Sequence, residues 1–320
     1  MATRFSSLSH LKQDFVILTS PPASGKTFWI RTFLSGLEND QKKVGIISPL
    51  RALAEECLEE WGHEMKISIM TPEEWLGNTI NFDVIILDEF HLYFYWGNSF
   101  RPQLWEAFFG LVERAELVIA LTATVSSEIF QEMRSFSLHF DSMLWINHGN
   151  QKLKYYPHQY IKAYSQSWIL EQIFSESKSS QTVKLIFCPY RKSVFQMKKK
   201  LERNGFSVVS CVGGEARDMR DKLSKCPRPH FIVATTVLSH GVNLPEISKI
   251  YLLYPLKNID FWIQMVARGG RRGGGYQVIG RETPYGMRWS FLKNLGLLIF
   301  LSFKARLKSF YHSYLSFYES

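Results

Sequence analysis

The sequence predicts an α/β protein with two parallel-sheet units and a helical C-terminal tail, and three observations lead to this prediction. Short apolar runs alternate with helical stretches along most of the 320 residues, which is typical of parallel sheets with crossover helices. The length suits about two domains of roughly 150 residues each. Residues 146–160, rich in polar residues with Gly and Pro, interrupt the alternation and are expected to form the linker.

The first unit is expected to contain five strands and two helices. The strand candidates are nearly continuous apolar runs, as expected of strands covered on both faces. A helix should run from near Gly25 to about Gly36, and another over the acidic stretch RALAEECLEEWGHE. The five predicted strands are FVILTS (15–20), KVGIISP (43–49), KISIMTP (66–72), FDVIILDE (82–89) and ELVIALTAT (116–124).

The second unit repeats this alternation after the linker. Helices are expected over residues 192–204, ended by Gly205, and over IDFWIQMVARGG. The predicted strands lie in VKLIFCP (183–189), FSVVSCV, HFIVATTV, KIYLLYP and YQVIG.

The predicted domain boundaries are 1–148, 149–285 and 286–320. The last segment belongs to a helical, basic and aromatic tail that begins at Arg288. It is expected to pack across a domain; an interfacial membrane helix, a nucleic-acid contact and a protein-partner contact are the alternatives.

Charge is divided unevenly along the chain. Residues 1–150 carry 11 Lys and Arg against 19 Asp and Glu, a formal charge of −8, whereas residues 151–320 carry 27 against 10, or +17. A basic second half indicates either a solvated surface or a site for a polyanion. The four cysteines form no C-x-x-C pair, which argues against a zinc site or a disulfide framework. With neither a signal-peptide pattern nor a long apolar run, we expect a cytoplasmic monomer that does not enter a membrane.

The stretch SPPASGKT (20–27) predicts a phosphate-binding loop because it follows a strand and precedes a helix. Backbone N–H groups at such a junction bind phosphate, and the lysine of the motif reaches the β- and γ-phosphates. The hydroxyl that follows can bind Mg²⁺. Pro21 and Pro22 lack N–H groups, so donation falls to the last five residues of the motif, Ala23, Ser24, Gly25, Lys26 and Thr27.

The stretch LDEFH (87–91) ends a predicted strand with two acids, Asp88 and Glu89. In an ATPase, the first acid at such a strand end holds Mg²⁺ and the second polarises the attacking water. The alternative is a helix N-cap followed by a first-turn acid. A position about sixty residues after Gly-Lys-Thr favours the ATPase interpretation.

The ordered set of motifs resembles the superfamily-two helicases and translocases. The resemblance covers residues 15–280, and motifs V and VI look most like the superkiller-type DExH branch. The departures are Ala23 and Ala267 in place of glycines and the lack of an adenine-reading Q motif, which leaves base selectivity open. In order, motifs I to VI correspond to SPPASGKT, SPLRALAEE (Ia), TPEEW (Ib), DEFH (II), LTATV (III), LIFCPYRKS (IV), ATTVLSHGVNLPE (V) and QMVARGGRRG (VI).

The resemblance implies two RecA-like domains that enclose ATP and Mg²⁺, with Thr27 and Asp88 as metal ligands. Arg268 and Arg271 would be arginine fingers that reach from the second domain to the first, placed three apart on one helical face. The other residues that it implies are Glu89 and Gln264 in catalysis, Gly241 and Asn243 beside the nucleotide, Thr122 and Thr124 in coupling, and Arg51, Thr71 and Thr235 on the nucleic-acid backbone.

The function that follows is a nucleic-acid-dependent ATPase that moves along single-stranded RNA or DNA as a helicase or translocase. Contacts to the backbone do not distinguish RNA from DNA. One alternative is an ATP-gated clamp or remodelling subunit that binds nucleic acid without unwinding it. A small P-loop kinase is disfavoured, because it needs neither a second α/β unit nor an arginine pair.

Overall fold

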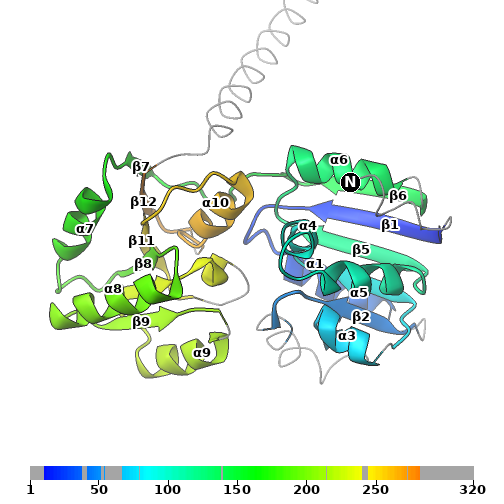
Figure 1. Cartoon of the computed structure of the whole chain (residues 1–320), viewed down its shortest axis with the longest axis horizontal. Helices are drawn as coiled ribbons and strands as arrows, with labels where there is room; N and C mark the ends of the chain where they lie inside the picture. The colour runs from blue at the N-terminus through cyan, green and yellow to red at the C-terminus, as the bar shows by residue number, and fades with distance from the viewer. Residues whose placement is uncertain are drawn as a thin grey trace, which may run out of the picture.

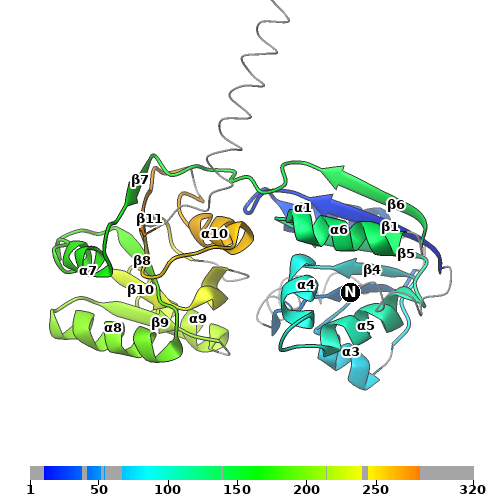
Figure 2. The same ribbon diagram turned by 45° about the horizontal axis from the view of Figure 1, so that its top comes forward.

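The chain folds into two α/β units, each built on a wholly parallel six-stranded sheet (Figure 1). The strands of the first sheet run toward the second unit (Figure 2). The computed structural model describes residues 11–37, 42–51, 54, 67–78, 80–137, 140–213, 215–239, 244–271 and 273–281.

The first sheet has the strand order β3-β2-β4-β5-β1-β6. Parallel pairing brings the ends of β1 and β5 side by side, with Thr19 opposite Thr122. Its elements are β1 (Leu11–Thr19), α1 (Lys26–Leu37), β2 (Val44–Ile47), β3 (Ile67–Met70), α3 (Pro72–Asn78), β4 (Val84–Leu87), α4 (His91–Gly97), α5 (Gln103–Val112), β5 (Leu117–Thr122), α6 (Ser127–Phe136) and β6 (Phe140–Asn147).

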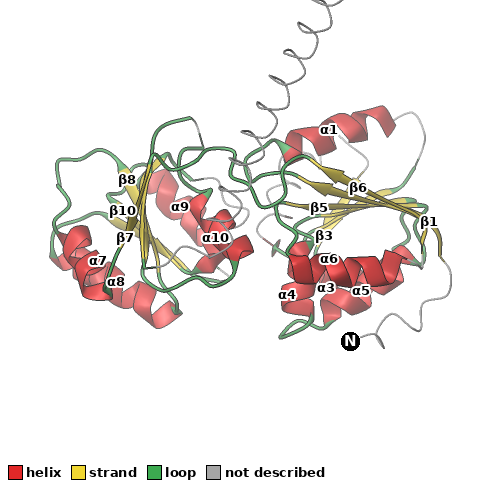
Figure 3. Ribbon diagram, turned by 90° about the horizontal axis from the view of Figure 1, so that it is seen from above, coloured by secondary structure: helices red, strands yellow, loops and turns green. Residues whose placement is uncertain are grey.

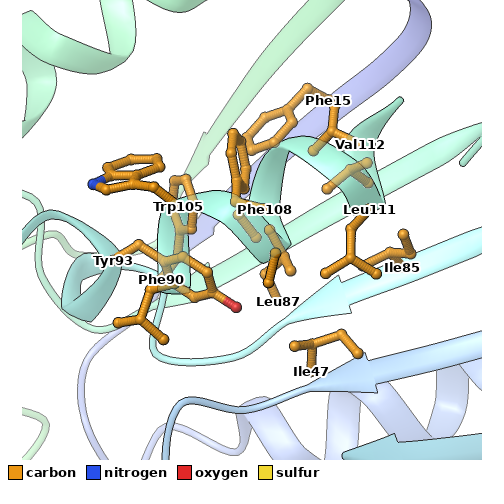
Figure 4. Packing of buried hydrophobic residues seen from close by; sticks show 14 of the residues in the cluster. Phe15, Ile47, Ile85, Leu87, Phe90, Tyr93, Trp105, Phe108, Leu111 and Val112 are labelled. Atoms are coloured by element: carbon orange, nitrogen blue, oxygen red, sulfur yellow. The ribbon is translucent and has the colours of Figure 1, made fainter. Parts of the chain in front are cut away.

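Helices cover both faces of this sheet, with α1 on one face and α3 to α6 on the other (Figure 3). The second of these faces holds an aromatic core in which Phe15 of β1 packs against Phe90, Phe108 and Phe140 (Figure 4). Rings of this size dominate core energetics because each buries a large apolar area. The core therefore fixes the strand ends from which the site residues project.

The second sheet has the order β7-β12-β11-β8-β10-β9, with α7 and α8 on one face and α9 and α10 on the other (Figure 3). Its strands and helices are β7 (Gln159–Lys162), α7 (Gln166–Phe174), β8 (Val183–Phe187), α8 (Arg191–Arg203), β9 (Val208–Cys211), α9 (Ala216–Lys225), β10 (Phe231–Ala234), a 3-10 helix (Thr236–Ser239), β11 (Ile247–Leu252), α10 (Ile259–Val266) and β12 (Gln277–Gly280).

These two sheets confirm the predicted tandem α/β architecture, with two differences at the linker. The expected linker, 146–160, contains the end of β6 and the start of β7. Both are edge strands with many exposed residues, so they lack the continuous apolar pattern by which the inner strands were predicted. Only residues 148–158 connect the sheets.

Two of the expected helical segments lie outside the described residues. The C-terminal helical extension, 286–320, is one, and most of RALAEECLEEWGHE is the other. In the part of the chain that the structure describes, no helix has the length and apolar character needed to cross a bilayer.

Candidate functional site

The loop between β1 and α1 is closed by its own lysine. Lys26 Nζ donates to the carbonyl oxygens of Ser20 at 3.1 Å and Pro21 at 3.3 Å, and the Ser20 and Ser24 hydroxyls hydrogen-bond to each other. The ammonium group thus lies on the concave side of the loop, where a phosphate group would replace the two carbonyl oxygens as its partner.

The same loop contains a non-glycine residue in the left-handed region. Ala23 has φ +61° and Gly25 has φ +99°. An alanine in this region is strained by roughly 1–2 kcal/mol relative to a right-handed conformation. The motif that the loop resembles has glycine at the position of Ala23. Glycine would adopt the left-handed conformation without this strain, which explains why the motif favours it.

The acid pair lies where β4 ends, as predicted. The Asp88 N–H donates to Ile47 O of the neighbouring strand, and Glu89 has φ +46°, a conformation that costs about 1–3 kcal/mol and clusters at functional sites. Burial and the adjacent Glu89 raise the pKa of Asp88 to about 7, against the opposing effect of Lys26. The pair therefore lies in a water-poor setting that favours a cationic partner.

The charges around Glu89 come from both units. Burial raises the pKa of its carboxyl, while the positive charges of Lys26, Arg268 and Arg271 act in the opposite direction. Arg271 also acts on Lys26, whose pKa burial lowers. The positive charges of a lysine of the first unit and of two arginines of the second thus act on one carboxylate.

The arginines do not lie on a helix, so the predicted shared helical face is wrong. Helix α10 ends at Val266, and Arg268 and Arg271 follow it in turns. Gly270 has φ +61°, and a Cβ built on Gly269 would lie 2.1 Å from the Tyr276 ring. These contacts and the positive φ require glycine in the turns that follow the helix. The Nε of Arg271 donates to Ala267 O at 3.2 Å.

A hydrogen-bonded chain joins the two units through His91. Gln264 Nε2 lies 2.6 Å from His91 Nε2, and His91 Nδ1 lies 2.9 Å from Thr122 Oγ1. Thr122 Oγ1 in turn donates to the carbonyl oxygen of Thr124. Burial lowers the pKa of His91 to about 4, so the ring is neutral near pH 7. Gln264 then donates to Nε2, and Nδ1–H donates to Thr122.

Sequence reasoning placed Gln264, Thr122 and Thr124 in the site but did not assign a role to His91. Its imidazole is fully buried and lies 3.5 Å from Glu89 Oε2. The signal was present in the sequence, since His91 closes the DEFH stretch. Only the fold shows that it links the acid pair to Gln264 in the second unit.

A second inter-unit contact has no signal in the sequence. Asp260 of α10, with none of its surface exposed, accepts from Tyr95 Oη at 2.5 Å and from Gln151 Nε2 at 2.9 Å. The rings of Tyr95 and Phe261 lie 5.1 Å apart. We call Tyr95, Gln151 and Asp260 the latch, because they join the first unit, the linker and the second unit.

The linker also contacts the phosphate loop. Lys154 Nζ donates to Ala23 O at 3.2 Å, and a Cβ built on Gly149 would lie 3.1 Å from Pro21 Cγ. The connection between the sheets is therefore seated against the loop that would hold the nucleotide.

The predicted nucleic-acid residues lie at strand ends on both sheets. Arg51, which is exposed, follows β2, and Thr71 follows the neighbouring β3. In the second unit, Thr235 follows β10. Thr71 also caps α3, because its hydroxyl accepts from the Glu74 N–H and its own N–H donates to Glu74, a capping box.

An aromatic pair beside this edge was missed by sequence reasoning. Phe100 is 68% exposed, and its ring lies 5.7 Å from that of Trp96. Arg101 lies over the Trp96 ring, donates to Pro49 O and pairs with Glu73 through two nitrogens. Arg101 therefore connects the segments after α4, β2 and β3.

The residues present fit a magnesium ion with bound phosphates. Mg²⁺ typically takes one or two protein carboxylates together with phosphate oxygens, and Asp88 supplies a carboxylate beside the loop lysine. Within the described residues no group donates a hydrogen bond to the buried Glu89 Oε2, which leaves an acceptor for a water molecule. The structure describes the backbone of Thr27 but not its side chain, and Gly241 and Asn243 lie outside the described residues.

Comparison with known proteins agrees with this geometry. Residues 165–273 match the model of the helicase conserved C-terminal domain. The ATP-dependent RNA helicase FAL1 of Kluyveromyces lactis is 24% identical over 200 residues, 61% of this chain and 50% of that protein. The ATP-dependent DNA helicase Q-like 2 of Arabidopsis thaliana is 24% identical over 288 residues, 84% of this chain and 39% of that protein. The chain spans half or less of the length of these relatives.

The fold is likewise that of solved helicases. The structure of S. cerevisiae Dbp5 bound to RNA and ADP BeF3 superposes with a TM-score of 0.66 at 16% identity, covering 83% of this chain and 78% of that one. The comparisons support a superfamily-two helicase core but do not confirm the superkiller-type branch. The architecture is that of two tandem RecA-like domains.

Proposed function

We propose that the chain is a nucleic-acid-dependent ATPase of the helicase or translocase type. The observation that carries this proposal is the electrostatic setting of the Glu89 carboxylate. The positive charges of Lys26 in one unit and of Arg268 and Arg271 in the other favour its ionised form. Phosphoryl transfer needs such a set, because positioned cations stabilise the charge that develops on the transferred phosphoryl group.

Each unit would contribute a separate part of the chemistry. The loop from Ala23 to Thr27 would bind the phosphates of ATP, and Asp88 with Thr27 would hold Mg²⁺. Glu89 would orient and polarise the attacking water, with Arg268 and Arg271 as the arginine fingers. Gly241 and Asn243 would adjoin the nucleotide.

Closure of the units would couple hydrolysis to movement along a strand. Gln264, His91 and Thr122 form the buried chain between the units, and Thr122 extends it to Thr124. A change in the phosphate groups at Glu89 would reach this chain through His91, which lies 3.5 Å from the carboxylate. We propose Thr122 and Thr124 as the coupling residues on this basis.

Nucleic acid would lie across the strand ends that carry Arg51, Thr71 and Thr235. The exposed Phe100 ring adds an aromatic surface at this edge, where single strands gain affinity by stacking. FAL1 is described as an RNA helicase and Q-like 2 as a DNA helicase, so both kinds of strand belong in the test.

The branch within the superfamily is a finer proposal. His91 takes part in the site through both ring nitrogens, which supports a DExH-type mechanism in which the histidine has a role. Exchange of His91 for the aspartate of DEAD-type proteins would remove the Nδ1–H that donates to Thr122, because a carboxylate only accepts, and turnover should fall.

The proposal is tested by the ATPase rate with single-stranded RNA, single-stranded DNA of equal length, and no nucleic acid. At least one of the two nucleic acids should raise the ATPase rate of the wild-type chain. Lys26→Ala should remain inactive with both. Equal rates with and without nucleic acid would contradict the proposal. Strand displacement on duplexes of both polarities then separates a helicase from an ATP-gated clamp, since a clamp would show stimulation without opening a duplex.

A further inference from the structure

Strand β6 forms one edge of the first sheet and is long for an edge strand. It contains eight residues, whereas β3, β7 and β9, at the other three edges, contain four each. In the described part of the chain, β6 pairs on one side only, with β1. Proteins usually protect such an edge by keeping it short or by placing Lys or Pro on it. The stretch FDSMLWIN of β6 contains neither residue.

The backbone of β6 can accept a further strand. Successive residues of a strand point their N–H and C=O groups to opposite sides. The N–H of His148, which directly follows β6, donates to Thr19 O of β1, so the even-numbered residues of β6 point these groups to β1. Hydrogen-bonding groups therefore point away from the sheet at the odd-numbered residues Asp141, Met143, Trp145 and Asn147.

Apolar side chains lie on both faces of this edge. On the face that α6 covers (Figure 3), the Trp145 ring lies 5.0 Å from the ring of Phe130, which is 40% exposed. On the face that α1 covers, Ile146 packs against the apolar cluster beneath that helix. Leu144 shares the face of Ile146 and is 55% exposed. A strand added here would need apolar side chains on both of its faces, and β6 itself has this pattern.

Two copies of β6 are complementary when they pair antiparallel about Leu144. Leu144 then lies opposite its counterpart in a non-hydrogen-bonded pair, the kind in which side chains approach most closely. Met143 lies opposite Trp145, and Asp141 lies opposite Asn147, so no like charges face each other. Because β6 runs toward the second unit (Figure 2), antiparallel pairing places the two second units at opposite ends of the joined sheets.

We propose that the chain forms a two-fold symmetric dimer in which β6 of each copy extends the first sheet of the other. Main-chain hydrogen bonds between the two edges supply affinity, and the apolar side chains on both faces select a strand of this pattern. Such an interface uses the same surface on both copies. The proposal does not depend on the ATPase function, and it replaces the monomer expected from the sequence.

Sedimentation velocity of the full chain across the micromolar range tests the dimer. Wild type should sediment as a dimer whose monomer fraction rises on dilution. Leu144→Lys and Leu144→Glu each remove a buried leucine from both sides of the interface and oppose like charges, so the dissociation constant should rise by about 10-fold or more. Because more than half of Leu144 is exposed in the single chain, neither substitution should unfold it.

A mixture of the two variants tests the register of the strands. When Leu144→Lys and Leu144→Glu are combined in equal amounts, opposite charges face each other across the two-fold axis. The mixture should therefore contain more dimer than either variant alone at the same total concentration. Ile80→Lys serves as the control, because Ile80 is an aliphatic residue 41% exposed between α3 and β4. This variant should dimerise like wild type.

Three results would overturn the proposal. One is a wild-type chain that is monomeric at every concentration. Another is an unchanged dissociation constant in Leu144→Lys, which would mean that the copies meet through a different surface. The third is a mixture that dimerises no better than the separate variants, which would mean that Leu144 does not face its counterpart.

Discussion

The two α/β units share one plan but bring opposite charges to the gap between them. The first unit supplies the Asp88 and Glu89 carboxylates at the end of β4, together with the loop lysine. The second supplies Arg268 and Arg271 from turns after α10. Neither unit alone holds both the acid that we propose orients water and the arginines that we propose stabilise the transition state. Activity should therefore depend on how the units meet.

The largest effect is expected from substitutions within the first unit. Lys26→Ala should reduce ATP turnover below detection, because the ammonium that reaches the phosphates is lost. Glu89→Gln should bind ATP and fail to hydrolyse it, since the amide cannot polarise the water as a carboxylate does. Steady-state hydrolysis combined with retention of labelled ATP measures both. A Glu89→Gln rate above a tenth of the wild-type rate would contradict the role of this acid.

A smaller effect is expected from the chain that joins the units. Gln264→Ala and His91→Ala each break the 2.6 Å contact between α10 and the histidine. An unsatisfied buried partner costs about 1–3 kcal/mol, so nucleic-acid-stimulated turnover should fall by about 10-fold.

The double variant tests whether the two residues act through one contact. It should be no slower than the slower single variant, because residues in one network are not additive. Losses that multiply would mean that His91 and Gln264 act independently. Gln166→Ala, an exposed glutamine at the start of α7, serves as the control and should retain full stimulation.

The latch should have a still smaller effect. Tyr95→Phe removes the hydroxyl that donates to Asp260 and should weaken contact between the units by about 1 kcal/mol. Small-angle scattering of the nucleotide-free chain should then show a larger radius of gyration. Tyr156→Phe, at an exposed linker tyrosine, should not change it. An unchanged radius in Tyr95→Phe would mean that the latch does not hold the units together in solution.

A separate effect concerns the stability of the first unit and its pH dependence rather than turnover. The pKa of Asp88 rises from 3.8 to about 7 on folding, so between these values the folded chain holds more protons than the unfolded chain. Folding stability from this group therefore falls as pH rises from about 4 to about 7. Because asparagine does not ionise, Asp88→Asn should not lose folding stability over this pH range.

The melting temperature measures this effect. Asp88→Asn should exceed the wild type by more at pH 8 than at pH 5. Asp221→Asn, at an exposed position on α9, should show no such difference. A larger gain for Asp88→Asn at pH 5 than at pH 8 would contradict the raised pKa.

The first unit was more predictable from sequence than the contacts between units. The phosphate loop and the acid pair are short segments whose chemistry depends on neighbours in the chain, and the inner strands are continuous apolar runs. Edge strands β6 and β7 escaped prediction because one side of each is exposed. The residue patterns of these two strands resemble that of a polar loop.

The contacts across the gap depend on tertiary placement. Tyr95 and Asp260 are 165 residues apart in the chain. Nothing in the sequence around either residue predicts that the two are in contact. The arginines were expected on a helix because their spacing fits one, but the helix ends at Val266, before either arginine. Their identity was predictable from the motif, whereas the turns that carry them required the structure.

The central claim is that one ATP site is completed by arginines from the second unit. The most direct test is the ATP turnover of Arg271→Ala at saturating ATP and nucleic acid, with ATP affinity measured on the same preparation. We predict that turnover falls by about 10³, the scale of a lost arginine finger, while ATP affinity changes by less than about threefold. Retained turnover, or a loss of affinity that accounts for the whole loss of turnover, would contradict the claim.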